Sequence, residues 1–200
     1  KDTSAIALTL PHPGGEVNRA RHCPQSPSLV ATRPASKVAY VFDIAKAAEE
    51  GPSATPWLTL RGHGDEGFGC AWSPHTNGQL TTCANDGTIC GWDIATAKGG
   101  GITPTYFASR GESAVADVQY SPQCPFTICA AGDDKALVFW DLRTQGDKCS
   151  QVVEGAHNAD INALAYPTFG EDDQFRLLSA SADRTVKLWD TRQLSKPVHT

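Results

Sequence analysis

Short apolar runs recur along the chain, and polar turns that contain Gly, Asp or Asn separate them. The clearest group occupies residues 157–190 and ends in a Trp-Asp dipeptide. Its runs lie at 161–166, 177–180 and 186–188. Each run is too short for a typical helix, and turn residues separate the runs, so the pattern predicts three β-strands joined by turns.

The same unit occurs four times, and its last residue is always an aspartate. The units cover about 11–43, 62–93, 109–141 and 155–190, and their closing Asp residues lie 48 to 50 residues apart. A further short run follows each unit and supplies a fourth, outer strand, at 57–60, 106–108, 149–153 and 198–200. Four-stranded units repeated at about 40–45 residues are typical of the blades of a β-propeller. The predicted fold class is therefore all-β, with about four consecutive propeller blades.

Three segments between the units complete this interpretation. Residues 1–10 are expected to form the outer strand of a preceding blade, 46–56 a polar connection, and the glycines at 99–101 a linker. The glycine run has no Lys-Ser/Thr after it, which argues against a phosphate-binding loop. Methionine is absent, and four blades leave two blade faces bare, so the chain is expected to be an internal segment of a larger propeller.

Composition narrows the function classes without naming one. The formal net charge is −5, which argues against a protein that coats nucleic acid and is compatible with a basic partner. No apolar run approaches the roughly 18 residues of a membrane span. The seven Cys residues include no CxxC pair, so neither a zinc site nor any other metal or cofactor is expected. Cys70, Cys83, Cys90 and Cys129 fall in predicted strands as buried free thiols, which fits a reducing compartment.

Two units carry a His, a hydroxyl residue, an Asp and a Trp at matching places. The first set is His63, Thr82, Asp86 and Trp92, and the second is His157, Ser179, Asp183 and Trp189. A catalytic triad uses similar groups, but no GxSxG nucleophile motif is present. Such groups can also satisfy one another in a buried structural hydrogen-bond network, and no enzymatic activity is predicted. The third unit has Gly111 and Ala130 at the His and hydroxyl positions, and the first has Phe42 at the Trp position.

The units that close in Trp-Asp resemble WD repeats, so the propeller is expected to be of the WD-repeat type. The resemblance implies that the Trp, hydroxyl, His and Asp of each set form a structural hydrogen-bonded chain, which is the stronger interpretation of these residues. Two units continue as Trp-Asp-x-Arg, ending in Arg143 and Arg192. This pattern resembles the one by which some WD-repeat proteins dock onto the adaptor of cullin-type ubiquitin ligases. The alternative is that each Arg caps the last carbonyls of its strand.

Longer stretches are more specific than these dipeptides. EVNRARHCPQSPSLVAT (16–32), GHGDEGFGCAWSP (62–74) and SADRTVKLWDTRQL (181–194) closely resemble the retinoblastoma-associated histone-binding WD-repeat family, which includes the small subunit of chromatin assembly factor. The similarity spans nearly the whole chain, roughly the second to fifth of that family's seven blades. It implies a nuclear histone chaperone and scaffold subunit of chromatin assembly, deacetylase, remodelling or Polycomb-type complexes, with the cytoplasm as a second location.

The resemblance also implies a site on the top face, where the family holds a basic histone tail over the central channel. Transferred by position, the tail-binding residues are Glu16, Asn18, Glu66, Phe68, Asp117, Asp160 and Asn162. Ala116 stands where the family has a Glu, with Asp117 beside it. Each position lies where a loop enters an inner strand, so these side chains are expected to converge on the channel mouth and attract Lys and Arg. The alternatives are solvated acidic loops on another WD-repeat scaffold, such as a ubiquitin-ligase substrate receptor or a ribosome-assembly factor.

Overall fold

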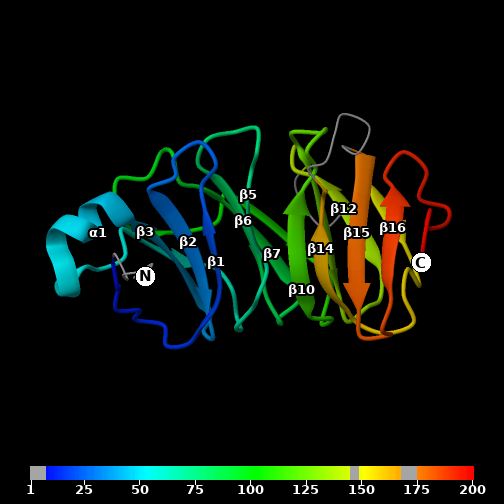
Figure 1. The fold of residues 1–200 in the computed structure, drawn as a ribbon, viewed down its shortest axis with the longest axis horizontal. Helices are drawn as coiled ribbons and strands as arrows, with labels where there is room; N and C mark the ends of the chain where they lie inside the picture. The colour runs from blue at the N-terminus through cyan, green and yellow to red at the C-terminus, as the bar shows by residue number, and fades with distance from the viewer. Residues whose placement is uncertain (1–7, 145–148, 168–174) are drawn as a thin grey trace, which may run out of the picture.

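The structure, a computed structural model, describes residues 8–144, 149–167 and 175–200. Four sheets stand side by side in chain order, from blade 1 near the N-terminus to blade 4 near the C-terminus (Figure 1). Within each sheet the first three strands are antiparallel neighbours. The predicted all-β propeller fold is confirmed.

Blade 1 contains five strands in the order β1-β2-β3-β4-β8. Their bounds are β1 (Val17–His22), β2 (Leu29–Pro34), β3 (Val38–Asp43), β4 (Leu58–Arg61) and β8 (Gly100–Ile102). The run expected at 1–10 lies mostly outside the described residues, and its described part, 8–10, is not in a strand.

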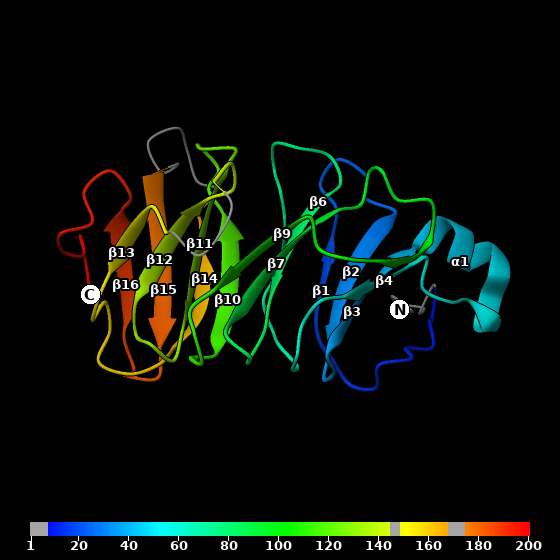
Figure 2. The same cartoon turned by 180° about the vertical axis from the view of Figure 1, so that it is seen from behind.

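The linker predicted at 99–101 is wrong, because β8 pairs in parallel with β4. Gly99 and Gly100 have positive φ angles of 103° and 85°, which glycine adopts without the steric cost that a Cβ brings. This conformation lets the chain between residues 93 and 106, which connects two strands of blade 2, turn back along the edge of blade 1 (Figure 2). Glycine therefore serves here to allow strand pairing.

A helix, α1 (Ile44–Glu50), occupies part of the connection that the sequence analysis described only as polar, and a 3-10 turn, η1 (Gly51–Ser53), follows it. The Asp43 side chain accepts a hydrogen bond from the Ala45 backbone N–H at 3.2 Å and caps the helix. Ala, Lys and Glu are strong helix formers, so the capping Asp and the residues after it favour a helix. It lies at the outer end of blade 1, away from the other blades (Figure 1).

Blades 2 and 3 share one plan, with an inner strand, two middle strands and an outer strand, whereas blade 4 has the first three strands and only an isolated bridge where an outer strand was expected at 198–200. Blade 2 consists of β5 (Cys70–Trp72), β6 (Gln79–Cys83), β7 (Thr88–Asp93) and β9 (Tyr106–Ser109). Blade 3 consists of β10 (Val115–Tyr120), β11 (Thr127–Gly132), β12 (Leu137–Asp141) and β13 (Gln151–Val153). Blade 4 consists of β14 (Ile161–Ala165), β15 (Arg176–Ser181) and β16 (Val186–Asp190), to which His199 adds one isolated bridge at Leu188.

Three apolar clusters hold adjacent blades together. Val41 and Leu60 of blade 1 pack with Trp72 and Leu80 of blade 2, and corresponding clusters join blades 2 and 3 and blades 3 and 4. Fully burying one Leu or Ile side chain contributes about 1.5–3 kcal/mol. The interfaces between blades thus form the core, and they position the loops at both ends of the strands.

Candidate functional site

One backbone hydrogen bond recurs at the entrance of every inner strand. In each blade a carbonyl just before the strand accepts from a backbone N–H just beyond the second strand, at 2.8 to 3.1 Å. The acceptor and donor residues are Glu16 and Ala35, Glu66 and Asn85, Ala114 and Asp133, and Asp160 and Ala182. Glu16, Glu66 and Asp160 therefore occupy equivalent places at the same end of three blades, and blade 3 has Ala114 there.

Two residues further along, a second equivalent set consists of Asn18, Phe68, Ala116 and Asn162. The last three line a hollow, whereas the side-chain amide of Asn18 donates to the Gly67 carbonyl at 3.4 Å. The strand register shifts at Asn18, Ala116 and Asn162, and such β-bulges redirect a side chain. The hollow has a volume of about 520 Å³, and Phe68, Ala116 and Asn162 line it with Arg19, Asn85, Ala114 and Asp133. We call this hollow the channel mouth.

Asp133 is a channel-mouth residue that the sequence analysis missed. It lies just beyond β11 and is exposed, and burial together with the nearby charges of Asp160 and Asp134 raises its pKa above the ordinary value. A raised pKa in a carboxyl near other carboxylates indicates a local excess of negative charge. Blade 3 thus contributes its carboxylate to the channel mouth from β11 and lacks one at the inner-strand entrance. In the sequence, Asp133 could have been identified by its position directly after the second predicted strand of the third unit.

The assignment of Asp117 to the tail-binding surface is wrong. Its side chain is 2% exposed and forms an ion pair of 2.6 Å with Arg19 of β1. It also accepts hydrogen bonds from the backbone N–H groups of Leu164 and Val118, at 2.9 and 3.0 Å. Burial raises the pKa of Asp117, while Arg19 and these N–H groups oppose that rise. Asp117 therefore joins blades 1, 3 and 4 beneath the channel mouth and is not available to a ligand.

The network of blade 4 connects four side chains in a line. Trp189 Nε1 donates to Ser179 Oγ at 2.9 Å, and Ser179 Oγ lies 2.7 Å from His157 Nε2. His157 Nδ1 lies 3.0 Å from Asp183 Oδ2, so Asp183 accepts the Nδ1 proton and Ser179 donates to Nε2. Hydrogen bonds from the Thr185 side chain, the Asn158 backbone and His157 hold the pKa of Asp183 below its usual range.

Blade 2 has the same network, with one further side chain, Thr88, between the His and the Asp. Trp92 Nε1 donates to Thr82 Oγ1 at 2.9 Å, and Thr82 Oγ1 lies 2.7 Å from His63 Nε2. The Thr88 hydroxyl bridges His63 Nδ1 at 2.7 Å to Asp86 at 2.6 Å. Burial, with a contribution from the positive charge of Arg33, lowers the pKa of His63 to about 3, against the pull of Asp86. Thr82 and Ser179 are both 0% exposed, so these hydroxyls act in packing and not as nucleophiles toward a substrate.

Blade 1 contains a partial network that the sequence analysis overlooked. His12 Nε2 lies 2.8 Å from Thr32 Oγ1, and the His12 ring contacts Tyr40 and Phe42 at centroid distances of 5.2 and 5.6 Å. Ser36 stands at the position of the network Asp. The signal for His12 was its interval before Thr32, which nearly equals the interval from His63 to Thr82.

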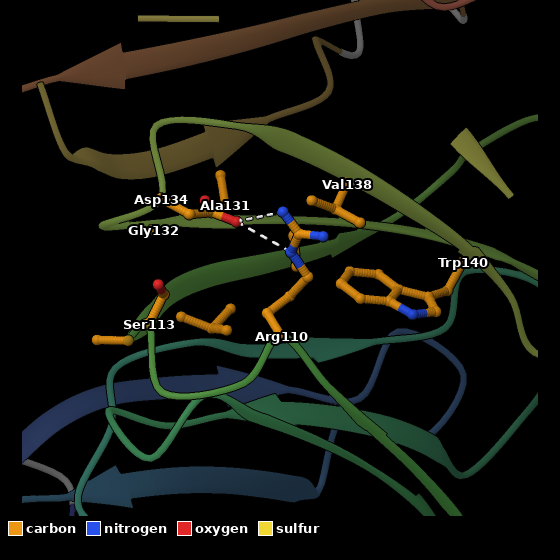
Figure 3. Close-up of a pocket in the computed structure, with 10 residues that line it drawn as sticks. Arg110, Ser113, Ala131, Gly132, Asp134, Val138 and Trp140 are labelled. Carbon is orange, nitrogen blue, oxygen red and sulfur yellow. Dashed lines mark hydrogen bonds and ion pairs between the residues drawn. The ribbon is translucent and has the colours of Figure 1, made fainter. Parts of the chain in front are cut away.

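Blade 3 replaces the missing histidine with an arginine. Arg110, next to Gly111, donates from Nε to Asp134 at 3.0 Å and forms an ion pair with it at 2.8 Å. Figure 3 shows the guanidinium of Arg110 between Asp134 and the indole of Trp140. Because Ala130 has no hydroxyl, the buried Trp140 Nε1 has no hydrogen-bond partner among the described residues. Ala130 and Trp140 line a small cavity of about 10 Å³.

Ala130→Ser should restore the acceptor that Trp140 lacks. A satisfied buried hydrogen bond contributes about 0.5–1.5 kcal/mol, and leaving one partner unpaired costs about 1–3 kcal/mol. We expect Ala130→Ser to raise the free energy of unfolding of the intact protein by about 1 kcal/mol, measured by urea denaturation. Ala156→Ser, at a buried site outside this cavity, is the control. If Ala130→Ser loses as much stability as the control, the inference that Trp140 lacks an acceptor at this position is wrong.

Arg143 and Arg192 each bond to the aspartate two residues before them, a contact that neither interpretation of the Trp-Asp-x-Arg pattern included. Arg143 Nε donates to Asp141 at 2.9 Å, and its guanidinium lies 5.2 Å from the Phe126 ring centre. Arg192 Nε donates to Asp190 at 2.9 Å and lies over Phe175 at 4.7 Å. Each Arg is thus held by the aspartate of its own Trp-Asp pair. The hydrogen bonds from the Arg143 side chain lower the pKa of Asp141 to about 2.

Chemistry beyond these groups is limited in the part of the chain that the structure describes. No group of three or more His, Cys, Asp or Glu is arranged there to hold a metal ion. No helix there is both long and apolar enough to cross a membrane. The four strand cysteines are buried free thiols, and burial raises the pKa of Cys70 to about 12, so this thiol stays protonated at neutral pH.

Two comparisons match this geometry. Residues 54–93 and 147–190 match the family model described as "WD domain, G-beta repeat". A chain in the solved structure titled "Crystal Structure of Mitotic Checkpoint Complex" is similar with a TM-score of 0.71 and 16% sequence identity, over 91% of this chain and 49% of that chain. The chain thus spans about half the length of its structural match. At this identity the likeness concerns the fold alone.

Proposed function

We propose that this chain, a WD-repeat protein, holds a basic histone tail over the channel mouth as a non-catalytic chaperone and scaffold subunit of nuclear chromatin complexes. WD-repeat propellers are in general protein-interaction scaffolds, and the repeat match and the fold support that broader role here. The histone, the chromatin complexes and the nuclear location are the proposal, which the sequence resemblance in 16–32, 62–74 and 181–194 motivates.

The observation that carries the proposal is a set of carboxylates at one end of the blades, beside a hollow whose lining includes Asn85, Asn162 and Phe68. Arg19 also lines the hollow, and Asp117 pairs its charge. Glu16, Glu66 and Asp160 occupy equivalent places at the entrances of three inner strands, and Asp133 lines the hollow. Together they attract a cationic peptide and orient its approach. The Asn162 side chain offers hydrogen bonds to a peptide backbone, and Phe68, which is 43% exposed, offers a ring face to a Lys or Arg.

The carboxylates differ in what they contribute. Exposed ion pairs add only about 0.2–1 kcal/mol each, so affinity is distributed over several residues. Glu66 is half-buried whereas Glu16 is exposed, so Glu66 holds a cation under weaker screening by solvent. Ala116, in place of the family's Glu, leaves open space where blade 3 meets the hollow. We therefore propose Glu66 as the stronger anchor and Glu16 as the second.

A second candidate function uses the other end of the blades. Arg143 and Arg192 are 66% and 58% exposed, and their shared Asp-Arg geometry supports docking onto a cullin-ligase adaptor as a substrate receptor. That surface is compatible with simultaneous binding at the channel mouth. The Asp-Arg pairs also fit a purely structural role, so this candidate ranks below the histone proposal, as does a ribosome-assembly scaffold.

The proposal is tested by titrating a core-histone tail peptide into the intact protein and its Glu16→Gln and Glu66→Gln variants by calorimetry. We expect Glu66→Gln to weaken binding by up to about fivefold and Glu16→Gln by less, as follows from about 0.2–1 kcal/mol per pair. Both should lower the salt dependence of the affinity. Glu49→Gln, on the exposed face of α1, is the matched control. Affinity and salt dependence that stay unchanged in both variants would rule the proposal out.

A further inference from the structure

One position in blade 2 differs from the same position in the other three blades. The residue before the Trp-Asp pair, or its equivalent, is Val41 in blade 1, Phe139 in blade 3 and Leu188 in blade 4. Val41 and Phe139 are 0% and 5% exposed, and each packs in the cluster shared with the following blade. In blade 2 this position is Gly91. The apolar side chain that should face blade 3 is therefore missing.

The missing side chain leaves an open pocket between blades 2 and 3. Tyr106 of β9 takes part of the space, since a Cβ at position 91 would lie 3.0 Å from the Tyr106 Cβ. The remaining pocket has a volume of about 220 Å³, and Tyr120, Phe126 and Leu142 of blade 3 line its other side. We call it the Gly91 pocket. Phe126 at its wall is 43% exposed, so the pocket offers apolar surface to solvent.

The size and charge of the Gly91 pocket define what fits it. Ligand sites for drug-sized molecules are about 300–1,000 Å³, so this pocket suits a single large side chain. Arg143 is the charged residue in its lining, and the carboxylate of Asp141 already neutralises it through bonds to Nε and Nη2. A charged occupant would lose its hydration without gaining a partner. Tyr and Phe rings on both walls favour an aromatic occupant by edge and stacking contacts.

We propose that the Gly91 pocket is a docking site for one neutral aromatic side chain of a partner polypeptide. The partner anchors this side chain between blades 2 and 3, and its main chain crosses the rim near Thr105, which is exposed. Buried aromatic anchors of this kind commonly carry much of the energy of an interface.

The Gly91 pocket is separate from the channel mouth. Its lining includes Gln79 at the start of β6 and Tyr120 at the end of β10, whereas the channel mouth lies at the start of β10. The two sites share no lining residue, so they lie at opposite ends of the blades and permit simultaneous binding. The inference holds whatever ligand the channel mouth takes.

The test uses N-acetyl-tryptophanamide as a probe, titrated into the intact protein and followed by NMR at the backbone amide of Gly91, which lines the pocket. We expect a saturable shift of this signal and no saturable shift of the backbone amide of Leu188, the equivalent position in blade 4. Phe126→Ala should weaken binding about three- to tenfold, since an aromatic pair contributes about 0.5–1.5 kcal/mol. Phe107→Ala, which removes an exposed ring of β9 outside the pocket, is the matched control and should leave affinity unchanged.

Charged probes separate this proposal from unspecific apolar binding. N-acetyl-lysinamide and the amide of N-acetyl-glutamate should give no saturable shift at Gly91. The proposal is overturned if N-acetyl-tryptophanamide produces no saturable shift at Gly91, if the charged probes bind as tightly, or if Phe107→Ala weakens binding as much as Phe126→Ala. Because the readout is a pocket residue, these outcomes do not depend on whether a histone tail binds elsewhere.

Discussion

Replacing Asp117 with Ala is expected to lower the free energy of unfolding of the intact protein by about 3–5 kcal/mol. The substitution leaves the guanidinium of Arg19, 18% exposed, without its carboxylate. It also removes the acceptor of the Leu164 and Val118 backbone N–H groups. An unpaired charge and unpaired donors within a core each cost free energy that nothing else at this place offsets.

Two further variants identify the source of that loss, measured by urea denaturation. Arg19→Met should destabilise less than Asp117→Ala, because Asp117 keeps its two backbone donors. Asp65→Ala removes an exposed carboxylate at the top face and should change stability by under about 0.5 kcal/mol. If Asp117→Ala costs no more than Asp65→Ala, the description of Asp117 as the link among blades 1, 3 and 4 is incorrect.

The second large effect is expected at Ser179. We predict that Ser179→Ala lowers the free energy of unfolding of the intact protein by about 2–4 kcal/mol. Its hydroxyl is fully buried, accepts from Trp189 and bonds to His157. Without it, one indole N–H and one imidazole nitrogen remain buried and unpaired, at about 1–3 kcal/mol each. The loss is read from the midpoint and slope of a denaturant melt.

Ser195→Ala, just after the same repeat, is the matched control, since Ser195 is exposed. It should leave the melt unchanged within about 0.5 kcal/mol. A Ser179→Ala melt that matches this control would mean that the network of blade 4 does not stabilise the fold. Blade 3, where Ala130 already leaves Trp140 unpaired, shows that a blade can form without the complete network.

The strands and the two complete networks could be predicted because their signals are local and repeated. Alternating apolar runs that end in Trp-Asp mark the strands, and the intervals from His63 to Thr82 and from His157 to Ser179 place the networks. The helix α1 was missed because it has only seven residues and follows directly after β3, with Asp43 both ending the strand and capping the helix. The β-bulges explain why Ala116 and Asn162 line the channel mouth, and no local sequence pattern predicts a bulge.

Other features depend on contacts between distant parts of the chain. The partner of Asp117 is Arg19, nearly a hundred residues away, so nothing near Asp117 in the sequence distinguishes it from an exposed carboxylate. The strand β8 exists because its backbone meets β4 of another blade. Arg110 takes the place of the missing histidine from the adjacent position, and a comparison that aligns only identical positions overlooks such a replacement.

The central claim is that a basic histone tail binds across the channel mouth, and NMR mapping of the tail-peptide titration with the intact protein tests it most directly. The claim predicts saturable, salt-dependent shifts of the side-chain amides of Asn18, Asn85 and Asn162. The amide of Gln79, at the opposite end of the blades, should not shift. Shifts confined to Gln79 and its neighbours, or no saturable shift of the three Asn amides, would contradict the claim.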